Sequence, residues 1–185
     1  MELTILLPIL AFVALGALAS IVLRRAGRAL AETRDADRFR RLVADLAARI
    51  ETSLDGVSDR IDALRRHQVT AEEIEANLSA ATDAVRRYAE EARSFPSPSR
   101  LADVRSGFID ELDRAARALE MVEHGCAILA SARVGGRELE AHTAIKRGYL
   151  NILHAREAIA RHALTAAAHR SSVERAGVGG STPRI

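Results

Sequence analysis

Six histidines are the residues of this chain best suited to bind a metal ion. They are His67, His124, His142, His154, His162 and His169. Metal-binding helices place their ligands three or four residues apart, so that both side chains project from one face. Only His162 and His169 share a face, and they lie two helical turns, about 10 Å, apart. One ion cannot bridge that distance, so the sequence predicts no metal site and no cofactor.

The stretch around His142, AHTAIKRG (Ala141–Gly148), is a second candidate for chemistry. It resembles the phosphoacceptor helix of histidine phosphotransfer domains, which are also four-helix bundles. In that pattern a lysine follows the histidine by three residues, and a small residue then lets a response regulator approach. Here Lys146 follows His142 by four residues, and Arg147 stands where the small residue is expected. The resemblance implies a signalling module with His142 as its phosphoacceptor.

Motifs of other common active sites are missing from the sequence. It contains no glycine-rich phosphate loop, no Cys-x-x-Cys pair and no nucleophile elbow. The one cysteine, Cys126, falls on the apolar side of its predicted helix, which favours a buried and inert thiol. We therefore expect a protein without enzymatic activity.

Apolar residues recur every three or four positions after residue 28, which predicts an all-α fold. Turn signals divide this part into four predicted helices, 29–67, 71–94, 100–133 and 137–170. Thr70 and Glu73 have the spacing of a capping box at the start of the second. Short connections make consecutive helices antiparallel neighbours, so we expect a bundle over residues 29–176. The glycine-rich residues 177–185 are expected to form a disordered tail.

Each predicted helix carries an apolar stripe, and the second repeats as a strict heptad. The stripe residues expected to make core or partner contacts are Ile74, Leu78, Val85, Tyr88, Leu112 and Leu119. The stripe of the fourth helix is less regular, because Arg156 interrupts it; it comprises Leu139, Ile145, Tyr149, Ile152, Ile159 and Ala163. A heptad with two apolar positions is also the seam of a coiled coil. Self-association is therefore an alternative to an intramolecular bundle.

The first 28 residues predict a single transmembrane anchor. Leu3–Leu23 carries no charge, and a helix of this length spans about 31 Å, the thickness of a hydrocarbon core. Arg24, Arg25 and Arg28 follow it, so the positive-inside rule predicts an N-terminus outside and a cytoplasmic body. A leader cleaved after Ala17-Leu18-Ala19 is the alternative, although the positive start of a secretory signal is missing.

The charge pattern argues against a nucleic-acid partner. The chain has 27 basic and 25 acidic residues, and Lys146 is the one basic residue that is not an arginine. This bias is typical of a GC-rich genome and favours a bacterial source. No aromatic residues are interleaved with the arginines for base stacking. In an antiparallel hairpin, moreover, Arg161 comes level with Asp110, and Glu157 with Arg114.

These observations predict a membrane-anchored helical scaffold on the cytoplasmic face of a bacterial inner membrane. Its expected partners are the lipid bilayer and either a second copy or an unidentified protein. A signalling module of the phosphotransfer or sensory type is the alternative.

Overall fold

The computed structural model describes residues 3–131 and 136–178, and within them the side chains of 3–15, 17, 29 and 169–178 lie outside the description. The described chain is helical and has no strand. It comprises α1 (Leu3–Arg65), α2 (Ala71–Ser94), a 3-10 turn η1 (Ser99–Leu101), α3 (Ala102–Ala130) and α4 (Glu138–Val178). The predicted all-α fold with about four helices is confirmed.

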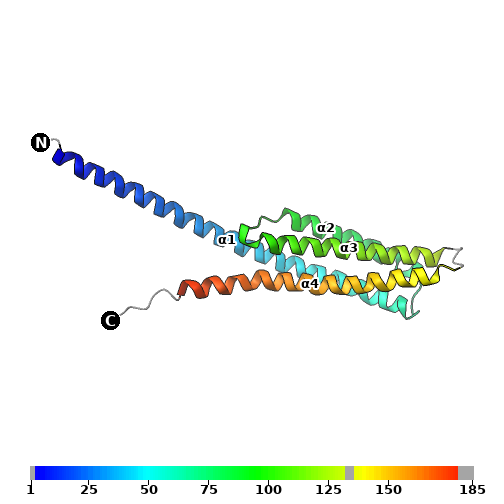
Figure 1. Ribbon diagram of the computed structural model, residues 1–185. Helices are drawn as coiled ribbons and strands as arrows, with labels where there is room; N and C mark the ends of the chain where they lie inside the picture. The colour runs from blue at the N-terminus through cyan, green and yellow to red at the C-terminus, as the bar shows by residue number, and fades with distance from the viewer. Residues whose placement is uncertain (1–2, 132–135, 179–185) are drawn as a thin grey trace. The chain divides into compact units, whose positions relative to one another are not determined.

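The chain forms two compact units, Met1–Arg38 and Phe39–Ile185. The first unit contains the beginning of α1, and its described side chains between residues 18 and 28 are exposed. The second unit, here called the body, contains the rest of α1 together with α2, α3 and α4, which lie side by side in Figure 1. The two units are described separately below.

The transmembrane part of the predicted fold is not confirmed. Among the described residues, no helix has a stretch long and apolar enough to cross a membrane. Most side chains of the predicted span Leu3–Leu23 lie outside the description, which covers only those of 16 and 18–23. The predicted tail also falls outside, except that α4 continues through residues 177 and 178.

The helices of the body run antiparallel, as predicted. Contacts between them join rising residue numbers on one helix to falling numbers on the next. These contacts include Arg49–Glu91 and Ser53–Tyr88 between α1 and α2, and Thr82–Glu123, Arg86–Glu120 and Arg93–Asp113 between α2 and α3. Helix α4 closes the bundle against α1, because the Arg156 guanidinium pairs with Glu51 and Asp55.

The ends of α2 follow from its sequence. The Thr70 amide donates to Glu73 Oε2 at 2.7 Å, and the Glu73 amide donates back to the Thr70 hydroxyl at 3.4 Å. This reciprocal pair is the predicted capping box. The helix ends at Ser94 because prolines at 96 and 98 cannot continue it, and Phe95 adopts an extended conformation with ψ 124°.

The apolar stripes of the first three helices fill the core. Eight large apolar residues of α1, spaced three or four positions apart, are buried: Phe39, Val43, Leu46, Ile50, Leu54, Val57, Ile61 and Leu64. Five of the six residues singled out on α2 and α3 are fully buried, namely Ile74, Leu78, Val85, Leu112 and Leu119. The sixth, Tyr88, is half-buried, and its hydroxyl lies 3.2 Å from Ser53 Oγ. The heptad stripe of α2 therefore packs within this chain.

The predicted stripe of α4 is partly wrong. Leu139 is 79% exposed, and Tyr149 is only half-buried. Ile145, Ile152 and Ile159 are buried as predicted, and Ala163 is half-buried. The buried face also includes Ala141, Gly148, Ala155, Ala158 and Ala166, which a pattern of large apolar residues does not reveal. Helix α4 also continues to Val178, beyond the predicted end at 170, since no glycine or proline occurs between residue 170 and Gly177.

Helices α3 and α4 approach closely through glycines. A Cβ atom on Gly125 would lie 2.7 Å from Ile145 Cγ1, and one on Gly148 would lie 2.7 Å from the Ala118 carbonyl oxygen. Real Cβ atoms do not come this close to other heavy atoms, so each glycine is required by the contact. Small residues on both helices thus fix the distance between α3 and α4.

We expect Gly148→Ala to lower the free energy of unfolding by about 1–2 kcal/mol, because overpacking against backbone outweighs the helix propensity gained. Gly56→Ala is the matched control, since no atom lies within 4 Å of its added Cβ. It should raise the stability by about 0.5–1 kcal/mol. Urea denaturation followed by circular dichroism measures both, and equal effects of the two substitutions would contradict the close packing of α3 on α4.

Candidate functional site

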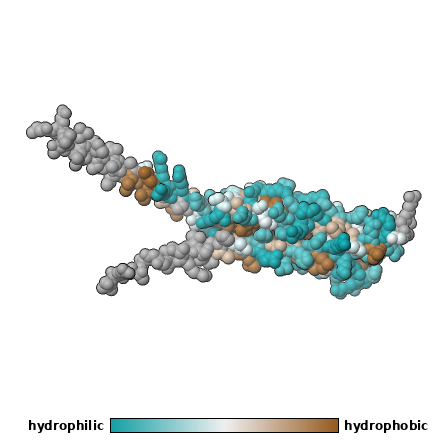
Figure 2. Space-filling model, in the orientation of Figure 1, coloured by the Kyte–Doolittle hydropathy of each residue, from teal (hydrophilic) through white to brown (hydrophobic). Residues whose placement is uncertain are grey.

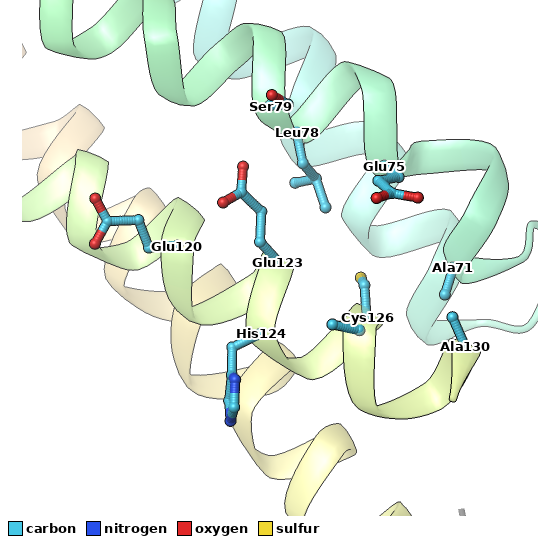
Figure 3. A pocket seen from close by; sticks show the side chains of 10 residues that line it. Ala71, Glu75, Leu78, Ser79, Glu120, Glu123, His124, Cys126 and Ala130 are labelled. Atoms are coloured by element: carbon cyan, nitrogen blue, oxygen red, sulfur yellow. The ribbon is translucent and has the colours of Figure 1, made fainter. Parts of the chain in front are cut away.

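A groove lies between the start of α2 and the end of α3. It has a volume of about 430 Å³, and Figure 3 shows its lining. From α2 it is lined by Ala71, Glu75, Leu78 and Ser79, and from α3 by Glu120, Glu123, His124, Cys126, Ala127 and Ala130. The two helices leave space here because several of the facing residues are small.

Three carboxylates line this groove, and two of them have hydrogen-bond partners. The Thr82 hydroxyl, which is buried, donates to Glu123 Oε1 at 2.9 Å. Arg86 donates to Glu120 Oε1 at 2.7 Å, and this hydrogen bond raises the pKa of the Arg86 guanidinium. Glu75 is exposed at the groove. The groove therefore offers hydrogen-bond acceptors and negative charge.

Cys126 lies at the floor of the groove and is 4% exposed. Figure 3 shows its side chain directed from α3 toward α2. Burial, and after it the negative charges of Glu123, Glu75 and Glu72 in that order, together raise the pKa of the Cys126 thiol to about 11. At neutral pH the sulfur is therefore protonated and supplies no nucleophile.

His142 is exposed at the start of α4, and the structure brings it next to His67. Their ring centroids are 5.8 Å apart with an angle of 76° between the rings. His67 is in the turn after α1, with a positive φ of 58°. An open depression around the pair is also lined by Glu72, Glu73 and Glu138. These carboxylates would repel an incoming phosphoryl group, and the role of His142 stays a prediction.

Arg156, which interrupts the predicted stripe of α4, has a structural partner on α1. Its guanidinium lies 2.5 Å from Glu51 and 2.8 Å from Asp55, and its side chain is 17% exposed. The hydrogen bond to Glu51 is the main cause that raises the pKa of Arg156. This half-buried arginine therefore ties α4 to α1.

The predicted ion pairs between α3 and α4 are not formed. Arg161 pairs with Glu157 one turn before it, at 3.3 Å, and Arg114 pairs with Glu111 at 3.1 Å. Both pairs lie within single helices. The register itself is as expected, because Gly148 meets Val122 and Gly107 meets His162. The contact between α3 and α4 is made by apolar and small residues.

Metal ligands do not gather in the described part of the chain. Among the side chains that the structure describes, no group of three histidine, cysteine, aspartate or glutamate residues is placed to hold one ion.

The predicted topology determinants Arg24, Arg25 and Arg28 are exposed on α1 in the first unit. Directly before them are apolar side chains that are also exposed: Leu18 at 66%, Ile21 at 53%, Val22 at 58% and Leu23 at 72%.

The sequence interpretation missed the outward side of α4. Leu139, Leu150 and Leu164 are exposed there, although leucine is usually buried. A search for a second apolar stripe on this helix would have found them, since all three fall on one side at heptad-like spacing.

No family model, curated protein or solved structure matches this chain at significant similarity.

We expect the Cys126 thiol of the folded protein to react with a thiol reagent at pH 7 at least about a hundredfold more slowly than after unfolding. The rise of its pKa from 9.0 to about 11 lowers the thiolate fraction by that factor. Burial also slows the access of the reagent to the sulfur. Titration with Ellman's reagent, with and without urea, measures the ratio. Equal rates would show that the thiol is open to solvent.

Proposed function

We propose that this protein is a membrane-anchored helical scaffold on the cytoplasmic face of a bacterial inner membrane. Its N-terminus lies outside, Leu3–Leu23 crosses the bilayer once, and the body binds other helical surfaces without catalysing a reaction. The observation that carries the proposal is the exposed apolar surface of α1 at residues 18–23, followed at once by Arg24, Arg25 and Arg28.

The energetics of this helix support an anchor. Exposed aliphatic side chains cost about 1.5–3 kcal/mol each relative to burial, and a bilayer removes that cost for a whole span. The three arginines gain instead from anionic headgroups, at about 1 kcal/mol each. An apolar run with a basic flank on one side therefore has a favoured depth and a favoured orientation.

The character of the body supports a binding role. Its groove supplies hydrogen-bond acceptors, and the thiol of Cys126 in it is protonated rather than nucleophilic. A continuous aliphatic core holds its helices together. The face of the body in Figure 2 is largely hydrophilic, and leucines are exposed on α4. A rigid, charged helical unit of this kind suits the presentation of a contact surface at a fixed place near the membrane.

The anchor is tested by fractionating cells that express the full chain. We expect the protein in the membrane pellet, where it resists alkaline carbonate and high salt. Val13→Arg places a charge at the centre of the span at a cost of about 2.5–3.5 kcal/mol, and should reduce the membrane fraction. Ala76→Arg, at an exposed position of α2, is the matched control and should have no effect. Release of the wild type by carbonate would overturn the anchor.

The signalling alternative rests on the exposed imidazole of His142. A small-molecule phosphodonor or a phosphorylated response regulator should label the wild type and His142→Ala equally if the scaffold proposal is correct. Labelling that is lost in His142→Ala would favour phosphotransfer instead.

A further inference from the structure

The side of α4 turned away from the core exposes three leucines. Leu139 is 79% exposed, Leu150 43% and Leu164 70%. Figure 2 shows brown patches within the largely teal surface of the body. Single exposed leucines are ordinary, but three on one side of one helix form a stripe.

This stripe has its own heptad repeat. Steps of four and three residues connect its members, which are Leu139, Thr143, Lys146, Leu150, Leu153, Glu157, Ala160 and Leu164, and which we call the outer face of α4. They fall within an arc of about 100° around the helix. Ala141, Ile145 and Ile152, which are buried, fall on the opposite side. Helix α4 thus carries two seams. Helices α3 and α1 pack on the inner side, and on the outer face Thr143 and Leu153 are half-buried while the other members are exposed.

We propose that the outer face of α4 binds the same face of a second copy of this chain, with the two helices antiparallel. A two-fold axis between Leu150 and Leu153 makes the sequence self-complementary. The two members of each resulting pair lie equally far from the axis along α4. These pairs are Leu150 with Leu153, Lys146 with Glu157, Thr143 with Ala160, and Leu139 with Leu164, each joining one copy to the other.

The two charges on the outer face select both the partner and its direction. Lys146 is exposed and has no ion-pair partner among the described residues, whereas Glu157 pairs only with Arg161 of its own helix. In the antiparallel dimer each Lys146 meets a Glu157 of the other copy, which forms two ion pairs. A parallel dimer would set Lys146 against Lys146 and Glu157 against Glu157, and would be repelled. A lipid surface is also a poorer occupant, because anionic headgroups repel Glu157.

The size of this face links the dimer to the membrane. From Leu139 to Leu164 the outer face is about 37 Å long and about 10 Å wide. The area of this face is therefore less than half of the roughly 800 Å² that each partner contributes to a standard interface. Such a contact is weak in dilute solution. The inference rests on the proposed function in this respect, since anchoring in one membrane raises the effective concentration of the body.

Disulfide crosslinking of the full chain tests the pairing and its direction. Copies carrying Leu139→Cys and copies carrying Leu164→Cys, with different tags, are expressed together and oxidised. Antiparallel pairing brings these two positions together, so we expect a disulfide between the two tags. Leu139→Cys alone should give no dimer, because its two cysteines would be about 37 Å apart. The wild type, whose Cys126 is buried, sets the background.

A dimer of Leu139→Cys with itself would overturn the antiparallel arrangement, and the absence of any mixed disulfide would overturn the proposal. Oxidation is carried out on whichever fraction contains the full chain. Failure to crosslink in the membrane pellet therefore refutes the dimer, whereas protein found in the soluble fraction refutes the anchor, and the two results are distinct.

Exchanging the charges at Lys146 and Glu157 in the two-tag crosslinking pair tests whether these residues form ion pairs between the copies. Lys146→Glu and Glu157→Lys should each lower the yield of mixed disulfide about threefold or more, because each replaces two attractive contacts with two repulsive ones. The double variant restores both pairs and should recover the yield. Arg87→Glu, at an exposed position of α2, is the control and should leave the yield unchanged. If the double variant crosslinks no better than the single ones, the proposed ion pairs are not formed.

Discussion

The close contact of α3 with α4 is the constraint on which the arrangement of the body depends. Gly125 and Gly148 allow the two backbones to approach, and a methyl group at either position would meet backbone or a packed side chain. This contact fixes the rotation of α4, since its small residues must face α3. The exposed leucines of α4 follow from the same rotation, because a helix that turns Gly148 and Ala155 inward turns Leu150 and Leu164 outward.

The interfaces of the bundle use different interactions. Between α2 and α3, ion pairs such as Arg86–Glu120 and Arg93–Asp113 border the aliphatic core. Arg156 ties α4 to α1 with two carboxylates. The α3–α4 contact depends instead on fit between small residues. Exposed ion pairs contribute little to stability, and packing contributes more, so the α3–α4 contact is expected to be the firmest part of the body.

Large apolar residues made the buried sides of most helices predictable from the sequence. Where small residues form the contact, the buried side was harder to predict. The stripes of α1, α2 and α3 contain phenylalanine, leucine, isoleucine and valine, whose periodicity identifies the buried side. Alanine and glycine occur on buried and exposed sides alike, so the pattern identified the three buried isoleucines of α4 but not its buried alanines and Gly148. The ion pairs expected from the level of Arg161 with Asp110 did not form, because register alone does not determine where a long side chain points. The groove beside Cys126 depends on distances between helices, which a one-dimensional pattern does not contain.

The central claim is that α3 and α4 form one tightly packed pair around which the body is built. Hydrogen exchange of backbone amides in the full chain tests it most directly, since protection reports the free energy of local opening. The account predicts the slowest exchange in α3 from Leu112 to Ile128 and in α4 from Ile145 to Ile159. Amides of α4 that exchange as fast as those of the turn at His67–Thr70, while α1 and α2 remain protected, would contradict it.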